Sequence, residues 1–399
     1  MRILLIMEEV SCGGAELSFF ALCQALATRC DVHVALYEGS LDNPTIRALC
    51  DSLRSTSTTV HRCTIPLNPG TLANLHRSFR RPAARMLADL IRIVRPDAVV
   101  VNLPTVERGQ AVADAVELCN PAPPLWGFLH LAHRPSVIGA RLGIVRNFLV
   151  PRLIRRFGRM VTVSQAGARE ISRRYGIGSP NVVRPPTAPL AALPIGADKC
   201  RLRRDQGLPD TFLLGIVGRI DIHHKGHDVA LRVTERLLRQ GNALQLVVVG
   251  DGPDREAVQR LAHRLGISLA VTFLGWRDDV GAVIPLLDAL VMPSRYEGLP
   301  QSALQAVTAQ VPVVGYAVDG LAELLPDAFA VPYGDEQGLG AAVESLMRQP
   351  HRWPGSELAI RAATSCEPGH VADQILALLD HSPVSGPSAL PDMLVRETP

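Results

Sequence analysis

A short loop in the second half of the chain carries one carboxylate and one glycine directly after an apolar run. The run 289–292 predicts a buried strand that stops at Pro293. The loop then contains Glu297 and Gly298, and a helix opens near Pro300. Backbone N–H groups that converge where a helix begins, together with the positive end of its dipole, bind anions. The loop therefore predicts a site for an oxygen-rich, anionic ligand, with Glu297 placed to accept hydrogen bonds from sugar hydroxyls.

Two cations stand in a second loop, between a predicted strand at 213–217 and a predicted helix at 227–239. Arg219 can bind phosphate oxygens through two parallel hydrogen bonds, and Lys225 adds a point charge to the same group. The chain has 39 Arg and only 2 Lys, which indicates that a compact ammonium is needed at Lys225. The pair can neutralise a diphosphate leaving group without a metal, and no Asp-x-Asp pair that would hold a diphosphate-bound cation occurs. Two surface cations in a loop remain the alternative.

The two halves of the chain differ in charge. Residues 1–190 contain 23 Arg, no Lys and 13 acidic residues, a net charge of +10, whereas residues 191–399 have a net charge of −7. Clusters in the basic half are Arg77, Arg80, Arg81 and Arg85, and Arg152, Arg155, Arg156 and Arg159. They are either solvated helix faces or a surface for anionic lipid headgroups, which contributes about 1 kcal/mol per basic residue. Nucleic acid is not an expected partner, because aromatic residues make up 4% of the chain and no binding motif is present.

The composition is that of a globular protein with reduced thiols. With 399 residues, 47% hydrophobic and 20% charged, the chain predicts two domains of roughly 180–200 residues. Its eight Cys are scattered without a Cys-x-x-Cys motif, so we expect cytoplasmic thiols and no metal site. The apolar run 3–7 ends at Glu8, which indicates a buried strand and not a signal peptide. No apolar run approaches the ~20 residues that a membrane span needs.

Apolar strands alternate with helices along both halves, which predicts α/β domains with parallel, doubly wound sheets. In the first half we expect strands at 2–7, 31–37, 98–101, 125–130 and 160–163, and helices at 15–28, 83–94 and 165–175. In the second half we expect strands at 213–217, 244–249, 271–274, 289–292 and 311–314, and helices at 227–239, 254–265 and from 301.

A Pro-rich stretch near 185–195 predicts a linker between the two domains. We therefore divide the chain into a domain of residues 1–190, a domain of residues 191–380 and a disordered tail of residues 381–399. Ligands of open parallel sheets bind at the carboxyl ends of the strands. Two such domains facing each other would bring the residues at their strand ends around one central cleft.

Motifs in a fixed order extend across about residues 1–350. They are Gly-Gly-Ala-Glu at 13–16, Arg95-Pro96-Asp97, Val163-Ser164, Gly218-Arg219, Lys225-Gly226, Gly250-Asp251-Gly252-Pro253, Phe273-Leu274-Gly275, Pro293-Ser294, Glu297-Gly298-Leu299-Pro300, Pro312-Val313-Val314, and Asp319-Gly320 with Glu323. Each motif alone is weak evidence, but their order and spacing are specific. The series resembles the retaining family 4 glycosyltransferases, which have the GT-B fold: two Rossmann-like domains facing a central cleft. The resemblance implies a nucleotide diphosphate sugar as donor.

The resemblance also implies roles for single residues in the donor site. Arg219 and Lys225 would hold the donor diphosphate, and Glu297 would bind hydroxyls of the donor sugar. The backbone amides around Gly298, Leu299 and Pro300 would orient sugar and phosphate. Family members read the nucleotide base mainly through backbone groups, at the positions of Gly275 and Trp276 here.

The first domain would complete the site from the other side. Gly13 and Gly14 would let its loop approach donor and acceptor closely. His130, at the end of the strand 125–130, would reach the donor sugar as a catalytic residue beside Glu297, Arg219 and Lys225. His133 competes for that role, and a structural histidine remains a further alternative.

The sequence departs from the family pattern at two places. The family usually carries a second Glu eight residues after the first, where it binds the ribose, and here that position is Gln305. An amide forfeits the charge-assisted hydrogen bond, which would weaken donor binding by roughly 1–2 kcal/mol. The second departure is Arg184-Pro185-Pro186, where many relatives carry Asn-Pro or Asn-Gly.

The resemblance implies a retaining, metal-independent hexosyltransferase without a cofactor. Its acceptor would be a hydroxyl of a saccharide or a lipid-linked saccharide, in the assembly of bacterial surface polysaccharide, lipopolysaccharide or glycolipid. The enzyme would be cytoplasmic, and peripheral on the inner membrane if its basic half contacts anionic lipid. Three alternatives remain. Gln305 favours a catalytically degenerate protein with a regulatory or scaffold role. The others are a nicotinamide oxidoreductase, although its Gly-x-Gly-x-x-Gly motif is missing, and a nucleotide-sugar epimerase.

Overall fold

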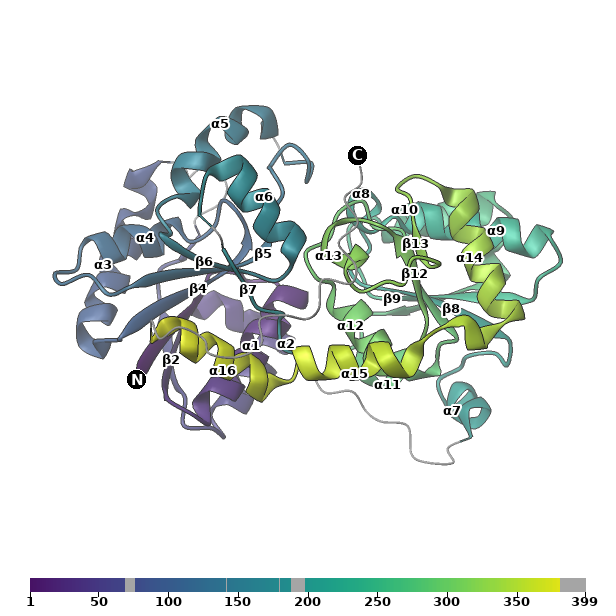
Figure 1. The fold of residues 1–399 in the computed structure, drawn as a ribbon, viewed down its shortest axis with the longest axis horizontal. Helices are drawn as coiled ribbons and strands as arrows, with labels where there is room; N and C mark the ends of the chain where they lie inside the picture. The colour runs from purple at the N-terminus through teal and green to yellow at the C-terminus, as the bar shows by residue number, and fades with distance from the viewer. Residues whose placement is uncertain (69–75, 141, 179, 188–197, 381–399) are drawn as a thin grey trace.

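A computed structural model describes residues 1–68, 76–140, 142–178, 180–187 and 198–380. Within these residues the chain forms two parallel sheets, each with helices on both faces (Figure 1). The expected linker near 185–195 lies largely outside the described residues, and the expected tail lies entirely outside them.

The first sheet has seven strands in the described part of the chain, in the order β3-β2-β1-β4-β5-β6-β7. Their bounds are β1 Arg2–Met7, β2 Asp31–Tyr37, β3 Thr59–Cys63, β4 Ala98–Thr105, β5 Leu125–Leu131, β6 Arg159–Thr162 and β7 Asn181–Val182. The strands β1 and β4 consist of nearly continuous apolar runs because both faces of a parallel sheet are covered by helices. The order reverses between β1 and β4, which is where such sheets place a ligand crevice.

The second sheet has six strands in the described residues, in the order β10-β9-β8-β11-β12-β13. Their bounds are β8 Phe212–Val217, β9 Leu244–Val249, β10 Val271–Gly275, β11 Ala289–Met292, β12 Val313–Tyr316 and β13 Ala330–Val331. In the described residues, the strand pairings of both sheets are parallel. The prediction of two doubly wound parallel-sheet domains is therefore confirmed.

Helices cover both sheets. Those of the first half are α1 Gly14–Ala27, α2 Pro44–Leu53, α3 Arg77–Val94, α4 Gln110–Glu117, α5 Gly143–Ile154 and α6 Gln165–Tyr175. Those of the second half are α7 Lys199–Asp205, α8 Ile222–Lys225, α9 His227–Arg239, α10 Arg255–Arg264, α11 Val280–Val283, α12 Gln301–Thr308, α13 Asp319–Ala322, α14 Glu336–Arg348, α15 Gly355–Ser365 and α16 Pro368–Leu379.

Several helix limits follow from capping chemistry, and one prediction was wrong. Ser164 caps α6 as expected, with its side chain accepting a hydrogen bond from the backbone of Gly167. The helix expected from residue 83 instead begins at Arg77, where the ring of His76 accepts from Ser78 N–H. Pro82 is tolerated inside α3 because it lies on the exposed face, where water can satisfy the carbonyl that lacks a partner.

The last helix returns to the first sheet. In Figure 1, α15 and α16 run beneath both domains, and α16 lies beside α1. Arg29 Nε, which follows α1, lies 2.6 Å from Asp373 Oδ1 of α16. The division at residues 190 and 191 remains a prediction, but residues 368–379, placed in the second domain from the sequence, pack on the first.

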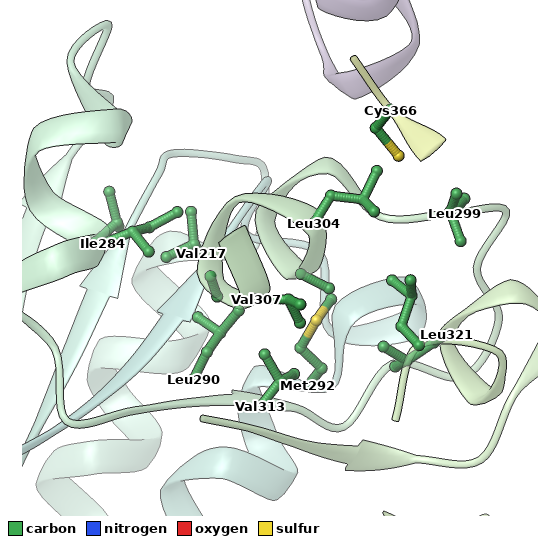
Figure 2. Packing of buried hydrophobic residues seen from close by; sticks show 14 of the residues in the cluster. Val217, Ile284, Leu290, Met292, Leu299, Leu304, Val307, Val313, Leu321 and Cys366 are labelled. Carbon is green, nitrogen blue, oxygen red and sulfur yellow. The ribbon is translucent and has the colours of Figure 1, made fainter. Parts of the chain in front are cut away.

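The core beneath the loop after β11 is well packed. Figure 2 shows Leu304 and Val307 of α12 lying over Leu290 and Met292 of β11. All four side chains are at most 4% exposed. This packing fixes where α12 begins, and with it the loop that the sequence marks as a ligand site. In the described residues, no helix combines the length and apolarity needed to span a membrane.

Candidate donor-binding site

The loop after β11 is held by backbone packing on both sides. Gly226, which ends α8, has a φ of +70°, and a Cβ there would lie 2.2 Å from the carbonyl oxygen of Pro293. Only glycine combines that φ with that approach at low cost. Pro300 occupies the N-cap position of α12, so the loop ends where the helix dipole begins. The second loop, at 218–226, is thereby fixed against the first.

Lys225 and Glu297 form the central ion pair of the site. Lys225 Nζ lies 2.6 Å from Glu297 Oε1, and the glutamate is 5% exposed. Burial alone would raise the pKa of Glu297, but the charge of Lys225, with smaller contributions from His224 and Ser294, leaves that pKa below its ordinary value. Glu297 is therefore an ionised hydrogen-bond acceptor near neutral pH.

Aromatic rings surround the same pair. His224 stacks on Tyr296 with ring centroids 4.3 Å apart, and its Nε2 donates to the carbonyl of Tyr296 at 3.1 Å. Burial, with the charge of Lys225, lowers the pKa of His224 to about 4, so this ring is neutral. His133 of the first domain makes an edge contact with Tyr296, with ring centroids 5.7 Å apart. Rings from both domains thus contact Tyr296, the residue before Glu297.

Glycines bring three loops of the second sheet together. A Cβ at Gly250 would lie 2.0 Å from the carbonyl oxygen of Gly218, and Gly250 N–H donates to the carbonyl of Gly275 at 2.8 Å. A Cβ at Gly218 would lie 3.6 Å from Lys225 Cε. The ends of β8, β9 and β10 are therefore in direct backbone contact beside Lys225, as expected for a site at the carboxyl edge of the sheet.

The predicted site residues differ in how they are exposed. Arg219 follows Gly218 and is exposed, and Trp276 is 48% exposed. Leu299 and Gln305 are both 7% exposed, and Pro300 is buried. Leu299 packs into the apolar core, so it can serve a ligand only through its backbone.

The first domain meets the site through Gly14 and α1. A Cβ at Gly14 would lie 3.4 Å from Gln301 Cγ of α12, and Gln301 Nε2 donates to Ser18 Oγ at 2.7 Å. Gly13 N–H donates to Glu16 Oε2 at 2.9 Å, a bond that fixes the start of α1. Gly14 therefore lies beside the N-terminus of α12, and the predicted approach of Gly13 and Gly14 to donor and acceptor stays a prediction.

His130 and His133 have different surroundings. His130 Nε2 lies 2.8 Å from Asn102 Oδ1 of the same sheet, and burial lowers the pKa of His130 to about 3. The contact of His130 with the second domain is its backbone, because a Cβ at Gly298 would lie 2.0 Å from the His130 carbonyl oxygen. The histidine side chain that meets the loop of Glu297 is His133. The role of His130 at the donor sugar remains a prediction.

The sequence interpretation gave no role to two carboxylates that bridge the domains. Asp319 Oδ2 lies 2.7 Å from His133 Nε2 and accepts from Glu297 N–H at 2.9 Å. Glu323 Oε1 accepts from Ala166 N–H, in the first turn of α6, at 2.8 Å. Both residues stood in a recognised motif, but no local pattern indicates a partner more than 150 positions away.

A third interdomain contact lies near Trp276. Trp276 Nε1 donates to Asp278 Oδ1 at 3.0 Å, and Thr45 Oγ1 of α2 donates to the same oxygen at 2.9 Å. The side of the site where the base was expected is thus tied to the first domain. Chemically, the arrangement offers an ammonium paired with an ionised carboxylate, Lys225 with Glu297, close to the N-terminus of α12, and Arg219 is exposed in the loop that leads to Lys225. In the described residues, no group of three or more His, Cys, Asp or Glu side chains is arranged to hold a metal ion.

Two family models match the chain, one in each half. The model described as Glycosyltransferase Family 4 matches residues 12–187, and the model described as Glycosyl transferases group 1 matches residues 211–349. The second match includes Arg219, Lys225, Glu297 and Gln305.

Sequence relatives and solved structures agree with these models. The chain is 31% identical over 211 residues to a 2-deoxystreptamine glucosyltransferase of Streptomyces kanamyceticus, which covers 49% of this chain and 53% of the relative. It is 27% identical over 156 residues to the lipopolysaccharide core biosynthesis glycosyltransferase LpsE of Rhizobium meliloti, covering 38% and 44%. The chain thus spans about half the length of these relatives.

The fold is that of a solved Anabaena protein, Alr3699/HepE in complex with UDP-glucose, with a TM-score of 0.74 and 19% identity over 95% of this chain and 99% of that one. WaaG, a glycosyltransferase involved in lipopolysaccharide biosynthesis, matches with a TM-score of 0.68 and 19% identity over 96% and 100%. At these identities the structures inform on the fold alone.

Proposed function

We infer the function of this chain from its family and its fold, because it is a family 4-type glycosyltransferase and has the GT-B fold. From that premise we propose that it moves a hexose from a nucleotide diphosphate sugar to a hydroxyl of a saccharide or lipid-linked acceptor. The observation that carries this proposal is the Lys225–Glu297 pair, set among the joined ends of β8, β9, β10 and β11.

The two cations have a defined chemical task in this proposal. When the bond between sugar and diphosphate breaks, negative charge grows on the leaving phosphate oxygens. Lys225 exchanges part of its contact with Glu297 for these oxygens, and Arg219 binds them with two parallel hydrogen bonds. The cations then take the place of a divalent metal, so the reaction proceeds without one. Glu297, released from part of its ion pair, accepts hydrogen bonds from the hydroxyls of the sugar.

Retention of configuration follows from attack on the face that the diphosphate leaves. The acceptor hydroxyl forms its bond to the oxocarbenium-like anomeric carbon on that face, and its proton passes to the departing phosphate. No protein nucleophile takes part. Catalysis therefore rests on stabilisation of the leaving group and on the positioning of both substrates.

The donor and acceptor classes follow from the relatives. Because Alr3699/HepE was solved with UDP-glucose, a uridine diphosphate hexose is the first donor to test. Relatives named for lipopolysaccharide core biosynthesis support a saccharide acceptor of the cell surface, and a relative named for 2-deoxystreptamine supports a small polyhydroxylated ring as the second acceptor class.

A membrane contact of the first domain is also proposed. Residues 118–169 contain eight Arg and no acidic residue; Arg152 and Arg155 are exposed, whereas Arg146 and Arg156 pair with carboxylates of the preceding segment. Within this stretch Ile144 and Phe148 of α5 are 73% and 78% exposed. Exposed apolar side chains among cations fit an anionic lipid surface. We expect salt-sensitive binding to anionic vesicles that is lost in Phe148→Ser. Binding should be kept in Ile360→Ser, a change of a residue on α15 that is 67% exposed. Equal binding to neutral vesicles would remove this part of the proposal.

The reaction itself is tested by following donor consumption by NMR, with and without a chelator and with saccharide acceptors. The proposal expects one nucleotide sugar to be consumed at the same rate with and without the chelator. The product should keep the anomeric configuration of the donor. An inverted product, or a rate abolished by the chelator, contradicts the mechanism. Consumption of none of the donors favours the catalytically degenerate alternative, for which Gln305 is the first residue to examine.

A further inference from the structure

Asp319 stands where the two domains meet, and its two hydrogen bonds go to opposite sides of the interface. Its Oδ2 lies 2.7 Å from Nε2 of His133 in the first domain and 2.9 Å from the backbone nitrogen of Glu297 in the second. A single carboxylate oxygen therefore ties a first-domain side chain to the residue that holds the central carboxylate of the site.

We propose that Asp319 is a positioning residue that fixes the backbone of Glu297 only while His133 holds it from the other domain. The inference rests on the proposed function, in which Glu297 binds the donor sugar. The carboxylate of Glu297 is then correctly placed for the donor sugar when the two domains are in contact.

The backbone of Asp319 supports a role beyond local folding. Its φ is +43°, in the left-handed region that residues other than glycine rarely adopt. Glycine would fit this conformation at lower cost. An aspartate at positive φ whose carboxylate makes two hydrogen bonds where the domains meet points to a function of that carboxylate.

The neighbouring residues leave little freedom for the loop. A Cβ at Gly320 would lie 1.8 Å from the carbonyl oxygen of Gly298, and a Cβ at Gly298 would lie 2.0 Å from that of His130. The turn at α13, the loop of Glu297 and the end of β5 are thus stacked backbone against backbone. A small shift of the first domain would therefore displace the backbone of Glu297.

A second, separate contact holds the same interface. Glu323 accepts a hydrogen bond from Ala166 N–H at the N-terminus of α6, where a carboxylate is favoured by the helix dipole. This contact secures α13 to the first domain without touching Glu297. Loss of the Asp319 carboxylate should therefore release the loop of Glu297 while the domains remain in contact.

The decisive variant is Asp319→Gly, because it removes the carboxylate and relieves the positive φ at once. We expect its melting temperature to stay level or rise. We also expect kcat for transfer to fall roughly 10- to 100-fold, as for a displaced binding group. Affinity for the free nucleoside diphosphate should change less than twofold, because Lys225 is untouched. Gln310→Gly is the matched control: Gln310 has a φ of +60° and is exposed, so its change should leave kcat unaltered.

Variants of His133 test the other end of the bridge. His133→Gln keeps an N–H at the position of Nε2 and should retain most activity, whereas His133→Ala should lose as much as Asp319→Gly. The double variant Asp319→Gly with His133→Ala should be no worse than either alone, because both remove one interaction. Additive losses, or wild-type kcat in Asp319→Gly, would overturn the proposal. A melting temperature and a nucleotide affinity that both fall in Asp319→Gly would also overturn the proposal.

Hydrogen exchange separates this inference from the proposed function. The amide of Glu297 should be protected in the wild-type protein and exchange faster in Asp319→Gly and in His133→Ala. This holds even if no donor sugar is ever transferred. An amide that exchanges equally fast in all three proteins contradicts the bridge, whatever the outcome of the activity assays.

Discussion

Two buried glutamates, one in each domain, have opposite electrostatic settings. Glu297 is 5% exposed and Glu8 is 3% exposed, and each follows the end of a strand, β11 and β1 respectively. Burial should raise both pKa values. It does so for Glu8, whose pKa rises to about 7, partly offset by a hydrogen bond from Gly109 N–H at 2.9 Å. The pKa of Glu297 is lowered instead, because Lys225 lies 2.6 Å away.

Lys225 already has an electrostatic role in the protein without a bound donor. A carboxylate without a close cation is driven towards its neutral form, whereas Lys225 keeps Glu297 ionised and ready to accept hydrogen bonds. The same lysine must then serve a diphosphate. The ion pair is therefore a resting arrangement from which both partners turn to the donor.

Removal of Lys225 gives the largest expected effect. Lys225→Ala takes away a cation aimed at the leaving group, so kcat/KM should fall roughly 10²- to 10³-fold. Steady-state kinetics with the preferred donor measures this. Lys199→Ala is the control, since Lys199 is the other lysine of the chain and binds Leu287 O and Asp288 away from this site. A loss of similar size in both variants would show that stability, and not the site, is affected.

The free energy of unfolding should depend on pH in opposite directions through Glu8 and through Glu297. Since the folded-state pKa of Glu8 is raised, its contribution to stability is complete below the unfolded value and is lost as pH rises through about 7. Glu8→Gln should remove this dependence and be more stable than wild type at pH 8, by on the order of 2 kcal/mol.

Glu297→Gln should act in the opposite direction, because a lowered pKa contributes stability that is present above the unfolded value and lost as pH falls. Urea unfolding of both variants at pH 8 measures the contrast in sign, and unfolding of wild type and Glu297→Gln below pH 4.5 tests whether the contribution of Glu297 is lost there. If both substitutions change the free energy of unfolding in the same direction at pH 8, the two glutamates do not have opposite electrostatic environments.

A smaller effect is expected at Gln305. Gln305→Glu restores the charge that family members usually carry at this position, and an added charge-assisted bond to the ribose contributes roughly 1–2 kcal/mol. Donor KM should fall about tenfold at unchanged kcat. Because Gln305 is 7% exposed, the new carboxylate needs the donor as its partner. A rise in KM would mean that this position does not face the ribose.

The sequence predicted well the features that are local in the chain. Five of the six strands of the second sheet, the loops at 218–226 and 293–300 and the cap of α6 by Ser164 follow from short patterns of apolar residues, glycines and capping groups, whereas the two-residue strand β13 was not predicted. The proximity of Lys225 to Glu297 followed from the rule that parallel strands share a carboxyl edge.

What the sequence could not supply depends on contacts between distant residues. The bonds from Asp319 to His133 and to the Glu297 amide need both domains in place. The return of α16 to the first domain is fixed by packing against α1 and has no local signal. The strand β3, Thr59–Cys63, was not predicted because it is a short edge strand with only one buried residue.

The central claim is that Lys225 and its neighbours bind a nucleoside diphosphate. Calorimetric titration of UDP, GDP, ADP and their sugars into wild type and Lys225→Ala tests it most directly. We predict that one nucleotide binds selectively to the wild-type protein and that its affinity falls at least tenfold in the variant. Binding of equal strength in both proteins, or binding of none of the nucleotides to wild type, would contradict the account.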